Sequence, residues 1–185
     1  MKLFYTLLLS LAGLLISSHS IAQGSLAALD AKNGFRDAKL GMKLSQFKGM
    51  YIYKADKAGD YVRNTDKKMI GDIPLKQIKY RFHKGILYGI FITADFNYGD
   101  DLVSVLESSY GKSKEDKYKN KYWKTSQIEM RLCPTIFSED DMDGMTIQII
   151  SISLAQKARY ENMQEFVEKQ NAGYDKQAAK RKADL

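Results

Sequence analysis

The sequence predicts an α+β domain, a two-layer sandwich in which an antiparallel sheet of hairpins carries helices on one face and ends in a C-terminal helix. Two stretches of alternating apolar and polar residues, within 75–96 and 118–133, predict hairpin strands. Apolar residues recur at helical spacing over 100–110 and again from about residue 155. Strands that are grouped into hairpins and separated from helices are typical of α+β folds.

The chain begins with the pattern of a secretory signal peptide over residues 1–22. Lys2 precedes an apolar run, and Ser20 and Ala22 place small residues at the −3 and −1 positions of a cleavage site before Gln23. The run, about 14 residues, is short for a membrane span. No cysteine lies next to the predicted cleavage site, so no lipoprotein anchor is expected.

Removing residues 1–22 from the 185 leaves 163 residues, enough for one domain, and lowers the formal net charge from +7 to +6. Cys133 is the only cysteine, so the chain forms no internal disulfide. We expect a periplasmic or extracellular protein that meets a protein, a glycan or an anionic polymer of the envelope. At that location nucleic acid is not an expected partner. After cleavage we expect no transmembrane segment, and we expect no cofactor.

The remaining chain divides into three parts. Residues 23–33 are predicted to be a leader segment that could hold one helical turn, and residues 34–170 a single α+β domain. Residues 171–185 are basic and low in apolar side chains, so they are predicted to be a disordered tail.

The first elements of the domain are expected to be short. Glycines bracket a candidate strand at 34–41, and Ser45 is placed to cap a short helix that ends at Gly49. Residues 51–53 predict a second strand. The charged segment 55–71 is expected to form a loop or a weak hairpin.

The clearest hairpin spans 75–96. Apolar and polar side chains alternate from Ile78 to His83, and Gly85 can adopt the positive φ of a tight turn. Residues 86–96 are almost continuously apolar, which predicts a central strand that is buried on both faces.

The second half continues with a helix at 100–110, which Asp100 and Asp101 favour at its N-terminus. We expect its end at Gly111. A hairpin of strands and a further strand then follow, at 118–123, 128–133 and 145–154. The terminal helix, from about residue 155, has an apolar stripe of four side chains, which are Tyr160, Met163, Phe166 and Val167.

Three short motifs lie at intervals along the chain. They are Gly34-Phe35-Arg36 with Leu40-Gly41-Met42, then Leu106 with Tyr110-Gly111-Lys112, then Trp123 at the start of a hairpin. Together they resemble small exported bacterial domains of unknown function. The resemblance implies a two-layer α+β sandwich, and it carries no activity and no site residues.

Residues 117–124 interleave lysines with aromatic rings and form the candidate binding site. The candidate residues are Tyr118, Lys119, Lys121, Tyr122 and Trp123. Rings that stack and cations that neutralise charge suit a glycan, an anionic polymer or an acidic partner. The alternative is an edge strand, in which alternating lysines discourage pairing with another sheet.

The sequence predicts no metal site, with calcium at the acidic loop as the alternative. Glu139, Asp141 and Asp143 alternate as in the start of a calcium loop. The first ligand of such a loop is Asp, however, and its twelfth is Glu, where this chain has Ile150. Otherwise the segment is a solvated turn between strands.

His83 and Cys133 are considered as a nucleophilic pair, because they are the one histidine and the one cysteine after residue 22. His83 falls at the expected hairpin turn, where an exposed polar residue is ordinary. Cys133 lacks a local catalytic signature, and it suits either a buried position or a disulfide between two chains.

Five carboxylates could serve a hydrolase, although the sequence places no two of them across a cleft. They are Asp95, Asp100, Asp101, Glu107 and Glu129.

We therefore predict an exported, non-catalytic binding or interaction module, with no catalytic residue assigned. One alternative is an inhibitor or immunity-type protein that blocks an enzyme with the 138–144 loop. The other is a small envelope hydrolase that uses carboxylates. Two carboxylates converging in a deep pocket would favour the hydrolase, and an aromatic-rich surface without such a pocket would favour binding.

Overall fold

The computed structural model describes residues 24–52, 59–136 and 143–183, so the predicted signal peptide lies outside the described residues. The strands are β1 (Gly34–Phe35), β2 (Ala38–Lys39), β3 (Met50–Ile52), β4 (Asp60–Arg63), β5 (Met69–Ile70), β6 (Ile73–His83), β7 (Ile86–Ala94), β8 (Lys114–Glu115), β9 (Lys121–Lys124), β10 (Ile128–Thr135) and β11 (Gly144–Ser151). The helices are α2 (Leu26–Lys32), α3 (Gly99–Tyr110) and α4 (Ile152–Ala183), with short 3-10 turns at Leu44–Gln46 and Phe96–Tyr98. The predicted α+β class is confirmed.

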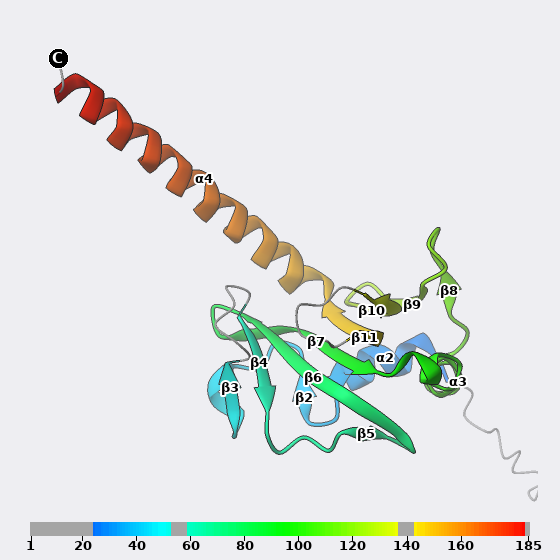
Figure 1. Cartoon of the computed structure of the whole chain (residues 1–185). Helices are drawn as coiled ribbons and strands as arrows, with labels where there is room; N and C mark the ends of the chain where they lie inside the picture. Colours follow the sequence, from blue (N-terminus) through cyan, green and yellow to red (C-terminus); the bar gives the residue numbers. More distant parts are fainter. Residues whose placement is uncertain (1–23, 53–58, 137–142, 184–185) are drawn as a thin grey trace, which may run out of the picture.

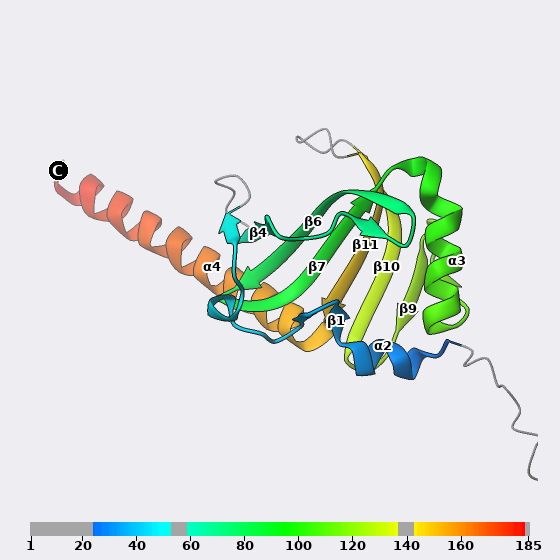
Figure 2. The ribbon, with the colours of Figure 1, turned by 90° about the horizontal axis from the view of Figure 1, so that it is seen from below.

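One antiparallel sheet of nine strands organises the described residues, in the order β3-β4-β6-β7-β11-β10-β9-β8 with β5 paired to β6. The β1–β2 hairpin is separate. Helices α2 and α3 cover one face of the sheet, whereas α4 leaves the end of β11 and extends away as a long rod (Figures 1 and 2). We call residues 160–183 of α4 the arm.

The β6–β7 hairpin lies at the centre of the sheet, as the alternation from Ile78 to His83 predicts. His83 pairs with Ile86, and the two residues between them, Lys84 and Gly85, have φ of 48° and 74°. Two successive positive φ values define the type I′ turn whose twist matches that of the flanking strands. The turn therefore sets the pairing next to it, up to Phe82 with Leu87, and a register shift between Phe82 and Arg81 follows in the ladder.

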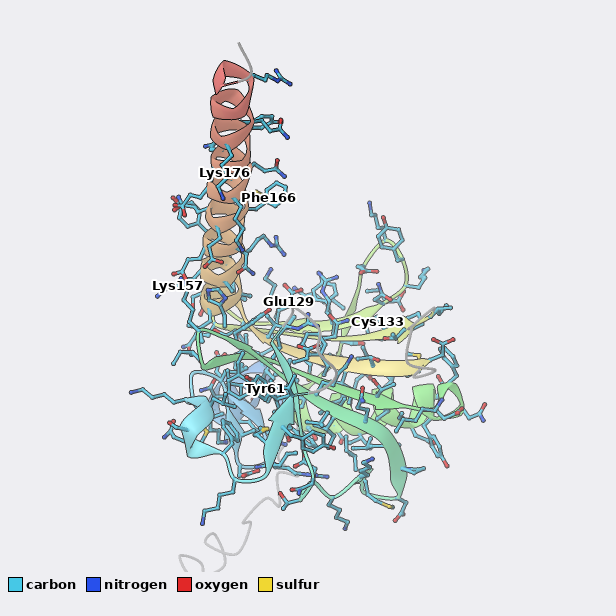
Figure 3. The ribbon with its side chains drawn as sticks, turned by 60° about the vertical axis from the view of Figure 1, so that its left-hand side comes forward. Tyr61, Glu129, Cys133, Lys157, Phe166 and Lys176 are labelled. Carbon is cyan, nitrogen blue, oxygen red and sulfur yellow. The ribbon has the colours of Figure 1, made fainter. Side chains whose placement is uncertain are left out.

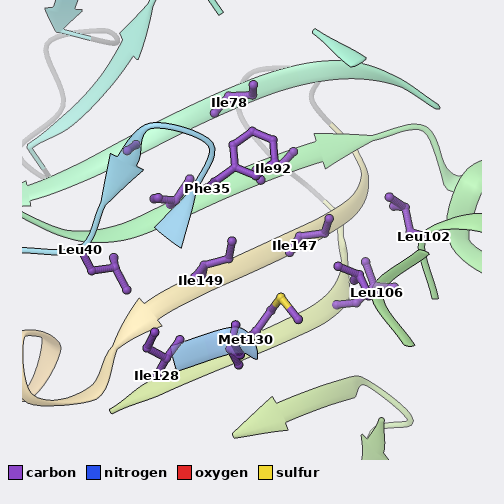
Figure 4. Close-up of a cluster of buried hydrophobic side chains, with 14 of the residues drawn as sticks. Phe35, Leu40, Ile78, Ile92, Leu102, Leu106, Ile128, Met130, Ile147 and Ile149 are labelled. Carbon is purple, nitrogen blue, oxygen red and sulfur yellow. The ribbon is translucent and has the colours of Figure 1, made fainter. Parts of the chain in front are cut away.

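The core lies on the sheet face that α2 and α3 cover. Because side chains alternate across a strand, the paired residues Met130, Ile149 and Ile90 of β10, β11 and β7 all point to this face. Leu102 and Leu106 of α3 belong to the same cluster and lie at the end of it that includes Met130 (Figure 4). All five of these side chains are buried.

Helix α2 differs from the predicted leader segment. It forms two turns, and Leu29 is 1% exposed within the main core cluster. The backbone N–H of Asn33, which has left-handed φ, donates to the carbonyl of Leu29 and ends the helix. Residues 26–32 are thus an integral part of the domain, a position that their weak apolar pattern did not reveal.

The C-terminal region also differs from the prediction. Strand β11 ends at Ser151, and α4 begins at once and continues to Ala183 through most of the predicted tail. Alanine, lysine, arginine and glutamine, which dominate after residue 175, are strong helix formers, so the helix propagates even without an apolar stripe. The segment 55–71, predicted to be a loop or a weak hairpin, contains strands β4 and β5.

The position of Leu29 makes a testable prediction. We expect Leu29→Ala to lower the free energy of unfolding by about 2–5 kcal/mol, because the substitution leaves a cavity in the core. Leu26→Ala is the matched control, since Leu26 lies on the same helix but is 39% exposed. Urea unfolding measures both variants, and equal small losses would contradict the assignment of α2 to the core.

Candidate functional site

All five predicted binding residues lie at the β8–β9 turn or on strand β9, and four of them are at least partly exposed. Tyr118 is 71% exposed, and Lys119 adopts a positive φ in the turn. Glu115 pairs with Lys121 at 2.6 Å and with Lys119 at 3.4 Å, and these two lysines lower the pKa of its carboxyl. The basic run therefore carries its own counter-charge, and Tyr122 beside it is half-buried.

Trp123 lies in the core and not on the binding surface that the sequence predicts. Its side chain is 1% exposed, and its indole Nε1–H donates to the carbonyl of Gly111 at 2.7 Å. This bond joins β9 to the end of α3. The alternation of lysines and rings did not distinguish the inward-facing position from its outward-facing neighbours.

The calcium alternative rests on residues that fall mostly outside the described ranges, since Glu139 and Asp141 lie within 137–142. Asp143 is described, and its carbonyl accepts a hydrogen bond of 2.6 Å from Lys76. Within the described residues, no three His, Cys, Asp or Glu side chains form a group that could hold a metal ion. Calcium at this loop stays a prediction.

The sheet register separates His83 from Cys133. Cys133 lies across the ladder from Thr146, then Thr93, then Gln77, which is six residues before His83 on β6. Six residues of strand span about 20 Å. Burial raises the pKa of the Cys133 thiol, which disfavours the nucleophilic thiolate. The two side chains do not form a catalytic pair.

Three of the five candidate carboxylates have separate partners and lowered pKa values. Ser113 and Lys112 lower the pKa of Glu107 to about 2, and Asn97 and Lys76 lower that of Asp95. Burial opposes the shift at Glu129, but Lys124 and Arg131 lower its pKa overall. A glycosidase acid needs a raised pKa. Asp100 and Asp101 occupy the first turn of α3.

A groove lies between α4 and the sheet face that points away from the core. Its volume is about 580 Å³. The sheet contributes Arg81, Tyr88, Phe91 and Ile150, and α4 contributes Ala155, Ala158, Arg159, Asn162, Met163 and Phe166. The groove thus combines aromatic and aliphatic walls with two guanidinium groups, a composition typical of protein interfaces.

The sheet wall of the groove is fixed by a bidentate ion pair. Arg81 Nε and Nη2 donate to the carboxylate of Asp60 at 2.6 and 2.7 Å, and Asp60 is 1% exposed. The Arg81 guanidinium also stacks 4.5 Å from the centre of the Phe91 ring. A Cβ at Gly89 would lie 3.0 Å from the Phe91 ring, which is close enough that the ring would have to shift.

The base of α4 is held at three points. The N–H of Ile152 donates to the carbonyl of Gln127, Ala158 is buried, and Glu161 contacts the β6–β7 turn. Glu161 pairs with Lys84 at 2.6 Å and with His83 at 2.9 Å. These contacts lower the pKa of the Glu161 carboxyl to about 2, with Lys84 the larger cause.

Beyond these contacts, the arm exposes an unusual amount of apolar surface. Five large side chains on it are between 47% and 67% exposed: Tyr160, Met163, Phe166, Val167 and Tyr174. Figure 3 shows Lys157 near the base of α4, and Phe166 and Lys176 on the part that rises clear of the body. Glu129 and Cys133 lie on the sheet face from which the helix rises.

The apolar stripe of residues 160–167 is visible in the sequence as helical spacing, but this spacing does not show whether the stripe packs on the sheet or faces solvent. Arg81, Phe91 and Ile150 carry no local signal, because the register of three strands brings them together.

Comparison with protein-family models, curated proteins and solved structures found no match to this chain. No helix in the ranges 24–52, 59–136 and 143–183 is both long and apolar enough to cross a membrane.

The contact of Glu161 with the turn predicts a pH dependence. The ordinary pKa of a Glu carboxyl, 4.5, falls to about 2 here, so this contact contributes stability above pH 4.5 that is lost as pH falls toward 2. We expect the wild type to exceed Glu161→Gln in urea midpoint at neutral pH, and this difference to shrink below pH 4.5. Lys157, 3.9 Å away, acts in the same direction.

The matched control is Glu165→Gln, because Glu165 lies 3.7 Å from Lys84 and is half exposed. Its effect on the urea midpoint should be smaller at every pH. A wild-type advantage over Glu161→Gln that stayed constant from pH 7 to pH 2.5 would contradict the pairing.

Proposed function

We propose that this chain is an exported, non-catalytic interaction module that binds a protein partner with the arm and the adjoining groove. The exposed apolar stripe of the arm is the observation that carries the proposal. The signal-peptide pattern of residues 1–22 supports export.

The exposed apolar area of the five side chains of the stripe is large for a surface that contacts only solvent. Three of its five side chains are aromatic and 58–67% exposed, and aromatic side chains of this kind offer 150–250 Å² each when fully exposed. The five together expose roughly 500 Å², the upper range for patches on monomeric proteins. Exposed patches of this size mark interaction sites.

The groove extends the same surface onto the sheet. Met163 and Phe166 belong both to the stripe and to the wall of the groove, so one partner can contact both. Arg81 is already oriented by Asp60, so its contact with a partner costs little further ordering. A rigid aromatic and arginine-lined surface supports recognition of a protein.

A catalytic function at this surface has little support. Asp60 and Glu129 lie beside the sheet wall of the groove, and both are already bound by cations. Arg81 holds both oxygens of Asp60, and Glu129, which pairs with Ile150 across the ladder, contacts Lys124 and Arg131. A hydrolase would need two carboxylates within about 10 Å of each other and open access to both. The glycan and anionic-polymer alternatives would use the β8–β9 turn, where Glu115 competes for the two lysines.

Site-specific photo-crosslinking in cells tests the proposal. We expect benzoylphenylalanine in place of Phe166 to form a covalent adduct with a protein. The same residue in place of Glu168, which is also exposed but lies on the opposite side of the helix, should form none. The absence of adducts from positions 163, 166 and 167 would contradict the proposal, and so would adducts confined to positions 119 and 121.

A further inference from the structure

We propose that the partner of the arm is a second copy of this chain, and that two arms pair antiparallel over residues 160–177. This inference rests on the proposed function, because it names the occupant of the same surface. Four features of the arm carry it: the spacing of its apolar residues, the composition of each layer, the distribution of charge and the area exposed.

The spacing matches the seam of a two-stranded coiled coil. Starting at Tyr160, alternating steps of three and four residues along one side of the helix pass through four of the five stripe residues and two glutamines, and Phe166 flanks this line. The six seam residues are Tyr160, Met163, Val167, Gln170, Tyr174 and Gln177. All six are exposed, so this side of the arm has no partner within the described part of the chain.

The composition of the layers selects the antiparallel arrangement. When two seams pair about a centre between Val167 and Gln170, Tyr160 meets Gln177, Met163 meets Tyr174, and Val167 meets Gln170. Every layer then contains at least one apolar side chain. A parallel pair would instead place Gln170 against Gln170 and Gln177 against Gln177, which buries two amides together at two of six layers.

The charges favour the same direction. Residues 160–168 contain three acidic and no basic side chains, whereas residues 169–182 contain five basic and one acidic. Antiparallel arms place the acidic segment of each copy beside the basic segment of the other, and parallel arms place like charges together. Within residues 160–177 these charges lie at outer positions of the helix and do not flank the seam, and Glu161 already pairs with Lys84, so they bias only the direction of pairing and add little to its strength.

The exposed area suits a reversible dimer. Roughly 500 Å² of stripe on each chain gives on the order of 1,000 Å² for two, which is the range of weak, specific interfaces. The antiparallel arrangement also brings Tyr174 of the second copy beside Met163, at the rim of the groove. The groove and the seam therefore form one continuous surface for the second arm.

Sedimentation equilibrium tests the association. We expect the protein to change from monomer to dimer at chain concentrations of roughly 10–500 µM. Val167→Glu should raise the dissociation constant at least about tenfold, since it buries a charge in the central layer. Ala172→Glu adds the same charge on the exposed far side and should change it by less than about twofold. Equal effects of the two variants would overturn the inference.

Disulfide trapping tests the direction. In a Cys133→Ser background, Met163→Cys and Tyr174→Cys proteins are oxidised alone and as a mixture. Antiparallel pairing predicts a covalent dimer in the mixture that joins the two variants and little dimer from either variant alone. Dimers from each variant alone, with no mixed product, would indicate parallel arms and overturn the proposed arrangement.

Two further outcomes separate this inference from the proposed function. The wild type could be a monomer at every concentration and still form a photo-adduct from position 166 whose mass differs from that of a dimer. That result would overturn the inference that the partner is a second copy, but it would retain the proposed binding of a protein. A monomer that floats with phosphatidylglycerol vesicles and forms no protein adduct would overturn both, because a membrane surface would then be the occupant.

Discussion

The two-residue turn at Lys84 and Gly85 is the constraint on which the rest of the structure depends. Its two positive φ values close the β6–β7 hairpin and set the pairing at that end of the central ladder, from His83 with Ile86 to Phe82 with Leu87. The same turn receives the N-terminal segment, since Gly85 accepts a hydrogen bond from Leu44. It also presents Lys84 and His83 to Glu161, 78 residues away from His83 in the sequence. A single turn thus positions the core face, the edge of the sheet and the base of the arm.

The two faces of the sheet have different roles as a consequence. One is closed by α2 and α3 over a continuous apolar core. The other bears Arg81, Phe91 and Ile150, and α4 covers only part of it before extending into solvent. A helix that leaves its sheet in this way gains little stability from its last five turns. Strong helix propensity maintains them, and pairing with another chain would bury their apolar stripe.

Local periodicity predicted the elements that depend on it. The alternation from Ile78 to His83 gave the central hairpin, and the helical spacing before Gly111 gave α3. Local periodicity did not predict features that depend on contacts between residues far apart in the sequence. Leu29 reaches the core because β1 and β2 fold beside it, and Trp123 points inward because its strand pairs with Met130. The arm was predicted to end early because the apolar stripe fades, although propensity alone sustains a helix there. Local patterns could not predict the groove, because its residues are brought together by the pairing of strands that are far apart in the sequence.

The central claim is that the arm is a contact surface for a second copy of this chain. Hydrogen–deuterium exchange of the wild type, compared at two chain concentrations that differ by about a hundredfold, tests it most directly. The account predicts that amides in residues 160–177 exchange more slowly at the higher concentration, while those of β9 are unchanged. Exchange along the arm that is equally fast at both concentrations would contradict the account.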